Sequence, residues 1–392
     1  MSTFHKPESV ASNGSSDSGN SVIKTVSHRS VAKISKLEAE KLPDIYYIIL
    51  DAYGRSDRLA EYYHLDNRPF LKALKQRGFY IADRSGANYD QTPLCIASAL
   101  NYNYLDKLID AHITPNDGNE KARQLLDDNK VINYLSKKGY KYIHIGSGVG
   151  ATRVDTADVE LNVSGESALF EDEAMGLTPL ESAPSTATPK YDEHRDKLIG
   201  AFNELDKVAK ILGPKFVFAH VLAPHPPFVL GANGESVYPH GPLNLSDGSW
   251  LLESLSREDY IKGYSNQLKY VNIRVIKALD QIKKLSRHTP IIIVQGDHGS
   301  RMNLDWANIK NTDLREPFSI LNAYNVPGKI LKDLYNTITP INSFRVILHD
   351  LFGANLPLLP DKSYYSTAYN PFDYIDVTSQ VRSTQKPLPA TK

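Results

Sequence analysis

Short apolar runs of strand length recur along the chain and are separated by longer segments. The run Ile45–Leu50 is too short for a helix and is rich in β-branched and aromatic residues, so it predicts a buried strand. Three further runs predict strands of the same kind: Lys141–Ile145, Lys215–Leu222 and Pro290–Gln295. From Tyr264 to Ile282, apolar residues recur at steps of three and four, which marks a long amphipathic helix.

Further helices are predicted between the strands, several of them ended by glycine or by Gly213-Pro214. They are Phe70–Gly78, Ala122–Lys138, Asp192–Leu212 and Ser343–Leu351. Strands that alternate with helices in this way predict an α/β fold, with a mainly parallel central sheet and helices on both faces.

Both ends of the chain are polar. Residues 1–40 include a cluster of Ser, Asn, Gly and Asp between Ser12 and Ser18, and we predict a disordered linker there because such a segment buries too little apolar surface to fold. Residues 367–392, with Pro387 and Pro389, are predicted to be a flexible tail for the same reason. One folded domain is therefore expected across residues 41–366.

Composition narrows the function classes. A hydrophobic fraction of 41% is enough for a full core, and equal numbers of basic and acidic residues, 45 each, give no electrostatic reason to expect nucleic acid. The single cysteine, Cys95, excludes an intrachain disulfide. No stretch approaches the ~18–20 apolar residues of a membrane span, and residues 1–20 lack the layout of a secretory signal. We expect the chain as given to be soluble, without a transmembrane segment; whether it is part of something larger, and its oligomeric state, stay open.

Polar side chains of ligand type follow three of the predicted strands. Asp51 comes directly after Leu50, and the strand from Pro290 ends in Gly296-Asp297-His298-Gly299. The strand from Lys215 includes His220 and leads into Pro224-His225-Pro226-Pro227-Phe228. Because ligands bind beyond the carboxyl ends of parallel strands, these side chains are expected to converge at one edge of the sheet.

Asp51, Asp297 and His298 together suit a divalent metal. Two carboxylates and an imidazole are ligands for Zn²⁺ or Mn²⁺, with Mg²⁺ as an alternative. Brought together without a cation, the carboxylates would repel and one would take up a proton. The alternative is that each aspartate caps a following helix or turn. For one aspartate alone the two interpretations have equal weight, whereas the pair with His298 favours the metal.

The candidate nucleophile is Thr92, which is followed by Pro93 in the pattern of an N-cap and first helical residue. Unpaired N–H groups of the helix would then face an anion beside Thr92. A metal touching the threonine oxygen would lower its pKa and supply the alkoxide at neutral pH. For Thr92 taken alone, an ordinary N-cap role is the better interpretation. The presence of Asp51 and Asp297-His298 in the same sequence favours the nucleophile instead.

The order of these motifs resembles the sulfatase-like branch of the alkaline phosphatase superfamily. The similarity extends roughly from Pro43 to Tyr365 and is greatest to bacterial sulfatase-domain proteins, which are related to lipoteichoic acid synthases and phosphoethanolamine transferases. It rests on Leu50-Asp51, a threonine that opens a short helix, His225-Pro226-Pro227-Phe228, and Gly296-Asp297-His298-Gly299. By this resemblance the fold is alkaline phosphatase-like, and the domain faces the extracytoplasmic side of a bacterial membrane.

The resemblance also implies roles for individual residues. Thr92 would form a covalent intermediate, and His225 would contact the substrate or protonate the leaving group, although His225 between prolines also suits a purely loop-ordering role. His220 would contact substrate, with a buried core histidine as an equal alternative. One divalent ion would be held by four residues: Asp51, Thr92, Asp297 and His298.

Three departures from the family pattern matter. Cys95 is followed by Ile96-Ala97-Ser98-Ala99, without the Pro and Arg of a sulfatase maturation motif, which argues against sulfate-ester hydrolysis by that route. Asp51 is followed by Ala52, where sulfatases usually carry a second aspartate. No Asp-x-x-x-His step is evident for a second zinc, so a single metal is expected.

Two arginines near the same sheet edge, Arg55 and Arg301, are candidates to clamp a phosphate, with ordinary surface arginines as the alternative. The sequence thus predicts a metal-dependent hydrolase or transferase that acts on phosphate mono- or diesters through a phospho-threonine, on envelope lipid or polymer headgroups. The alternative from another class is a non-catalytic anion-binding protein of the same fold.

Overall fold

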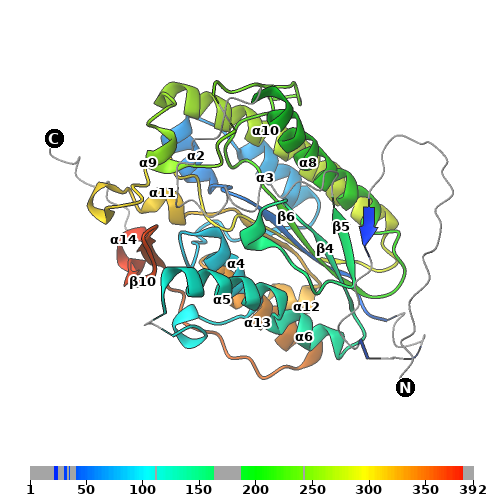
Figure 1. Cartoon of the computed structure of the whole chain (residues 1–392). Helices are drawn as coiled ribbons and strands as arrows, with labels where there is room; N and C mark the ends of the chain where they lie inside the picture. The colour runs from blue at the N-terminus through cyan, green and yellow to red at the C-terminus, as the bar shows by residue number, and fades with distance from the viewer. Residues whose placement is uncertain are drawn as a thin grey trace, which may run out of the picture.

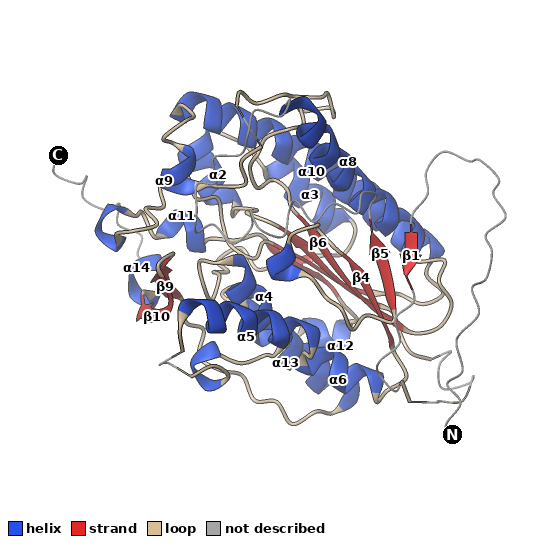
Figure 2. Cartoon of the chain, viewed as in Figure 1, coloured by secondary structure: helices blue, strands red, loops and turns tan. Residues whose placement is uncertain are grey.

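A mainly parallel sheet forms the centre of the molecule (Figure 2). The computed structural model describes residues 22–24, 31–32, 35, 41–110, 113–162, 187–241 and 243–382. In this part of the chain, eight strands form one sheet in the order β1-β5-β4-β6-β2-β7-β8-β3. The strands are β1 (Val22–Lys24), β2 (Ile45–Leu50), β3 (Tyr80–Ile81), β4 (Lys141–Ile145), β5 (Val159–Asn162), β6 (Lys215–Val221), β7 (Ile291–Gln295) and β8 (Asn322–Asn325).

The sheet is parallel in the middle and antiparallel at its edges. β2 lies between β6 and β7 and is parallel to both, and β4 and β5 continue the parallel part beyond β6. β1 pairs antiparallel with β5, while β8 and β3 close the other edge in antiparallel pairs. The carboxyl ends of β2, β6 and β7 therefore meet side by side, as the predicted parallel sheet requires.

Helices cover both faces of the sheet (Figure 1). Along β2, Tyr46 and Ile48 point into one core cluster, and Tyr47 and Ile49 point into the other. The first face is covered by α2 (Ser56–Tyr63), α3 (Arg68–Gln76), α8 (Ala187–Val208) and α10 (Arg257–Leu285). The second is covered by α4 (Thr92–Leu100), α5 (Pro115–Asp127), α6 (Lys130–Ser136), α12 (Gly328–Leu331) and α13 (Pro340–Phe352). Burial on both faces explains why β2 is apolar throughout, and the predicted fold class is confirmed.

One predicted helix is in fact two. The segment Ala122–Lys138 is divided between α5, which ends at Asp127, and α6, which begins at Lys130. The side chain of Asn129 caps α6 by accepting a hydrogen bond of 2.9 Å from the backbone N–H of Ile132. A capping asparagine competes well with continuation of a helix, so the chain restarts there.

The C-terminal segment is more ordered than predicted. Part of the expected flexible tail forms a hairpin of β9 (Tyr364–Thr367) and β10 (Asn370–Asp376), followed by α14 (Thr378–Arg382). Val377 and Val381 are buried in a third apolar cluster with Phe318. These contacts order the segment although its overall composition is polar. Residues 383–392 lie outside the described residues, and so does most of the predicted 1–40 linker, of which Val22–Lys24 forms β1.

Short elements complete the fold around the sheet edge. They are α9 (Gly248–Leu251), α11 (Arg315–Phe318) and the 3₁₀ turns η1 (Leu105–Lys107), η2 (Gly150–Thr152) and η3 (Ile309–Asn311). Among the helices of the described ranges, none combines the length and apolar character that crossing a bilayer would need.

Candidate active site

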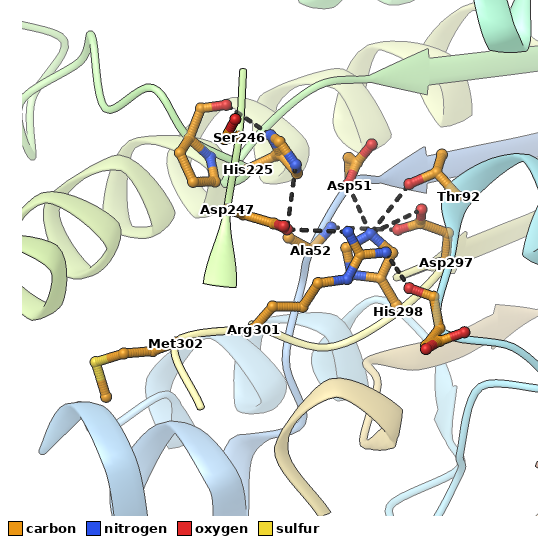
Figure 3. A network of polar contacts seen from close by, with 12 residues as sticks. Asp51, Ala52, Thr92, His225, Ser246, Asp247, Asp297, His298, Arg301 and Met302 are labelled. Atoms are coloured by element: carbon orange, nitrogen blue, oxygen red, sulfur yellow. Dashed lines mark hydrogen bonds and ion pairs between the residues drawn. The ribbon is translucent and has the colours of Figure 1, made fainter. Parts of the chain in front are cut away.

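Four side chains from three separate segments converge beyond the carboxyl ends of β2 and β7 (Figure 3). Nε2 of His298 lies 3.1 Å from Oγ1 of Thr92, 3.2 Å from Oδ1 of Asp51 and 3.3 Å from Oδ2 of Asp297. All four were candidate metal ligands from the sequence, and the fold brings them to one point.

Three oxygen atoms and one imidazole nitrogen meet at this point, and each of them is of a type that binds metal ions. His298 Nδ1–H donates to the carbonyl of Gly299 at 2.7 Å, which turns its Nε2 toward Thr92 and the two carboxylates as the nitrogen that would bind a cation. Oδ1 of Asp51 and Oδ2 of Asp297 are buried and lack a hydrogen-bond partner among the described residues. Ligand atoms about 2.1 Å from a tetrahedral ion would lie roughly 3.4 Å apart, close to the spacing seen here. The donor set therefore fits a divalent cation.

The backbone explains why glycines flank Asp297-His298. A Cβ on Gly296 would lie 2.5 Å from a carbonyl oxygen of the loop after β2, and one on Gly299 would lie 2.1 Å from a carbonyl oxygen of α11. Ala52 adopts the left-handed region with φ of 64°, and its N–H donates to Oδ1 of Asp297 at 3.2 Å. These close backbone approaches join the loops after β2 and β7 and hold the two aspartates together.

Thr92 opens α4, but the prediction that it is the N-cap residue is wrong by one position. Gln91 is the N-cap residue, in an extended conformation, and Thr92 is the first helical residue. The Thr92 hydroxyl therefore faces His298 instead of capping its own helix. One turn later, Cys95 is buried, its Sγ–H donates to the carbonyl of Tyr89 at 3.1 Å, and burial raises the pKa of its thiol well above the ordinary value. A buried protonated thiol is inert as a nucleophile.

His220 lies against the carboxylates. Its Nε2 is 3.0 Å from Oδ2 of Asp51, and its Nδ1 is 3.1 Å from Oγ1 of Thr152. We assign the Nε2 proton to the Asp51 contact, because a carboxylate only accepts, and this leaves Oδ1 of Asp51 turned toward His298. Burial alone would raise the pKa of Asp51, but His225, His220 and His298 hold it well below its ordinary value. Metal-type atoms of Asp51, His220 and Asp297 lie within 4.8 Å of one another.

His225 is held as a cation. Its Nδ1–H donates to the carbonyl of Pro226 at 2.6 Å, and its Nε2 lies 3.3 Å from Oδ2 of Asp247. Both neighbours only accept, so both ring nitrogens carry a proton. Burial alone would lower the pKa of His225, but Asp51 and Asp247 raise it to about 9.

Arg301 shares Asp247 with His225. Its Nη1 donates to Oδ2 of Asp247 at 2.9 Å, and its Nη2 donates to the carbonyl of Asp90. Burial alone would raise the pKa of Asp247, but Arg301 and His225 hold it below its ordinary value. One carboxylate thus positions two cations beside the candidate nucleophile.

Arg55, the other predicted phosphate ligand, is not brought to this site. Its guanidinium donates to Asp57 and to the carbonyl of Ser85 at 2.8 Å, and it is absent from the lining of the cleft above the site. Conversely, Asp247 and Thr152 were missed by the sequence interpretation. Thr152 ends the 3₁₀ turn η2 and Asp247 directly precedes the short helix α9. Neither element is long enough to show a periodic pattern in the sequence, so only the tertiary contact reveals these residues.

A cleft of about 450 Å³ opens over the site. Thr92, His220, His225, Asp247 and Arg301 are among the residues that line it, together with residues of α5, η2, α9 and the β9–β10 hairpin. The candidate nucleophile and the two cations therefore share one accessible space large enough for an organic ligand.

Neither a family model nor a curated protein sequence matches the chain. Solved structures do match. The C-terminal periplasmic domain of EcEptC from Escherichia coli is 13% identical, with a TM-score of 0.50 over 91% of this chain and 95% of that domain. A 2-O GAG sulfatase is 13% identical, with a TM-score of 0.51 over 83% of this chain and 73% of that one. The chain has the fold that these two proteins share, which we call sulfatase-like.

A third match with the sulfatase-like fold is an integral membrane protein, lipooligosaccharide phosphoethanolamine transferase A from Neisseria meningitidis. It is 12% identical, with a TM-score of 0.52 over 78% of this chain and 54% of that protein. At such identities the likeness establishes the fold alone, and this fold is the one that the order of the sequence motifs led us to expect. The chemistry of this sulfatase-like domain rests on its own side chains.

Proposed function

We propose that the chain is a metal-dependent enzyme that cleaves or transfers phosphate mono- or diesters, with Thr92 as the nucleophile. One observation supports this most strongly: Nε2 of His298 lies within 3.3 Å of the Thr92 hydroxyl and of two carboxylate oxygens that are buried and have no hydrogen-bond partner among the described residues. Neither a capping threonine nor a structural charge cluster needs that arrangement.

Asp51, Thr92, Asp297 and His298 would hold the cation. When bound, a divalent ion there lowers the pKa of the threonine hydroxyl and offsets charge on phosphoryl oxygens. Zn²⁺ or Mn²⁺ suits this set better than Mg²⁺, because one ligand is an imidazole nitrogen. A structure of the EcEptC domain with the same fold is described as a complex with Zn.

The residues of the chain then divide the reaction into two displacements. The Thr92 hydroxyl gives its proton to solvent and the resulting alkoxide attacks phosphorus. The bond to the ester oxygen breaks, and the leaving oxygen takes the Nε2 proton of His225. Arg301 places positive charge beside the phosphoryl group. In the second step water or an acceptor hydroxyl gives its proton to His225 and attacks phosphorus, which releases Thr92. The same geometry serves a hydrolase or a transferase, since only the acceptor differs.

Phosphoesters fit this site better than sulfate esters, because Cys95 is buried away from the cleft and Thr92 occupies the nucleophile position. The test is turnover of p-nitrophenyl phosphate, bis-p-nitrophenyl phosphate and p-nitrophenyl sulfate with Mn²⁺ or Zn²⁺ supplied. Hydrolysis of a phosphate ester is expected, with the sulfate ester at background. A non-catalytic anion-binding protein would leave all three intact, and that result would refute the proposal.

An extracytoplasmic location, with envelope lipid or polymer headgroups as substrates, is part of the same proposal. It is supported by two of the matching structures, of which one is a periplasmic domain and the other an integral membrane protein, lipooligosaccharide phosphoethanolamine transferase A. Cell fractionation tests it, and recovery of the native protein only from the cytosol would contradict it.

Asp247→Asn is expected to lower kcat by an amount that depends on the leaving group of the substrate. Loss of the carboxylate weakens the hold on the protonated His225, so an alkyl phosphodiester, which needs a proton on its leaving oxygen, should lose about 10²-fold in kcat. Bis-p-nitrophenyl phosphate, whose leaving group is stable as an anion, should lose far less. Asp66→Asn, at an exposed carboxylate bonded to Arg68, is the matched control. Equal losses for both substrates would assign Asp247 to holding Arg301 instead.

A further inference from the structure

Two tryptophans form a stacked pair on the wall of the cleft. Trp250 belongs to α9 and Trp306 to the loop after β7, and their ring centroids are 5.4 Å apart with an interplanar angle of 27°. They are the chain's only tryptophans, and both line the cleft above Thr92. Trp306 is buried, whereas Trp250 is partly exposed.

The inner ring is tied to the proposed catalytic groups. Trp306 Nε1–H donates to the carbonyl of Asp247 at 3.1 Å, and the Arg301 guanidinium lies 5.0 Å from the Trp306 ring centroid. Asp247 in turn contacts His225, the proposed proton donor. The tryptophan pair therefore lies on the side of the site where the leaving oxygen and its attached group would be. Because Trp306 is buried, only the partly exposed ring of Trp250 is available to contact a ligand.

A second wall of the cleft is polar and has its charges compensated. It includes Asn116, Asn119, Glu120 and Arg123 of α5. The Arg123 guanidinium is paired with Glu120 at 2.9 Å and with Asp155 at 3.3 Å. Amide groups and paired charged groups of this kind can donate hydrogen bonds to the hydroxyls of a ligand and accept hydrogen bonds from them. A ligand with a second anionic group would find no unpaired cation among these residues to neutralise it.

We propose that Trp250 is the stacking surface for a sugar ring that carries the scissile phosphoester, so that the substrates are phosphoesters of a neutral, hydroxylated sugar. This inference rests on the proposed function and names its substrate class. A cleft of about 450 Å³ has room for a ring beside the phosphoryl group. The electron-rich face of an indole attracts the weakly positive C–H groups of a sugar ring, and the polar wall receives the hydroxyls.

Binding can be followed by intrinsic fluorescence, because every tryptophan of the chain is in the cleft. The full chain with Thr92→Ala, which prevents turnover, is titrated with glucose 6-phosphate, glycerol 3-phosphate, phenyl phosphate and inorganic phosphate. Glucose 6-phosphate should bind about tenfold more tightly than glycerol 3-phosphate, a preference of the size that one aromatic contact supplies. Trp250→Ala should remove the preference, with Trp306 as the remaining reporter and inorganic phosphate binding unchanged.

Trp250→Phe separates stacking from structure, since it keeps an aromatic face and should retain most of the preference. Tyr238→Ala, at an exposed aromatic outside the cleft, should change nothing. Equal affinities for glucose 6-phosphate and glycerol 3-phosphate would overturn the inference, and so would tighter binding of phenyl phosphate. Wild-type turnover of bis-p-nitrophenyl phosphate is measured alongside. Turnover without ring preference rejects the sugar surface alone, and ring preference without turnover rejects the proposed function.

Discussion

Thr92→Ala is expected to abolish turnover of phosphoesters and to leave the fold intact. The substitution removes the only hydroxyl that meets the His298–Asp51–Asp297 group in the described structure, and loss of a nucleophile should lower kcat by at least about 10³-fold. Because the Thr92 hydroxyl does not cap α4, the structural change is confined to one hydrogen bond, about 0.5–1.5 kcal/mol of stability.

The measurement is kcat for bis-p-nitrophenyl phosphate together with thermal unfolding followed by circular dichroism. Ser98→Ala is a matched control, because Ser98 lies in the same helix and its hydroxyl donates to the Cys95 carbonyl at 2.8 Å, within the helix. Thr92→Ser, which restores a hydroxyl, should recover part of the rate. A folded Thr92→Ala variant with near-normal kcat would move the nucleophile's role to water or to Ser98.

Chelation of divalent metal ions is expected to abolish phosphoester turnover without unfolding the chain. Three of the proposed ligands follow strands β2 and β7, and Thr92 opens α4. These elements pack in two apolar clusters of their own, so folding is not expected to depend on the ion. Chelation should lower stability by mass action only. A structural zinc site behaves differently, because there the binding energy is folding energy.

Circular dichroism and phosphodiesterase rate are measured on the same chelated sample, which is then titrated with Mn²⁺, Zn²⁺ and Mg²⁺. The helical signal should persist, the rate should fall to background, and Mn²⁺ or Zn²⁺ should restore it in preference to Mg²⁺. His298→Ala should weaken this preference, whereas His64→Ala, at a residue after α2 and away from the site, should not. Full activity after exhaustive chelation would contradict the mechanism, and loss of the helical signal would make the ion structural.

Much of the sheet and part of the site followed from local sequence. Ile45–Leu50 was predicted with the bounds that β2 has, because a strand buried on both faces must be apolar throughout. Asp51 and Asp297-His298 were then placed together by one rule, that the carboxyl ends of neighbouring parallel strands share an edge. In the structure these residues converge with Thr92, whereas their role in metal binding stays a prediction.

Predictions from local sequence were wrong where a side chain caps a helix within a periodic pattern, and where order depends on contacts with distant parts of the chain. Asn129 interrupted a pattern that otherwise suited a continuous helix, and capping outweighed continuation. The segment after residue 366 has a polar composition, yet Val377 and Val381 find burial against a cluster assembled from distant parts of the chain. Composition reports how much apolar surface a segment has, whereas order depends on whether a partner surface exists for it.

The sequence by itself determined which strands are buried and which ligand-type residues follow them, because both depend on neighbours along the chain. Only the tertiary structure decided how the cations are used. It gave Arg301 and His225 a shared partner in Asp247, turned Arg55 toward the carbonyl of Ser85, and set the two tryptophans together. These contacts join loops that have no periodicity, and the position of such a loop is set by packing against distant elements, which no local pattern records.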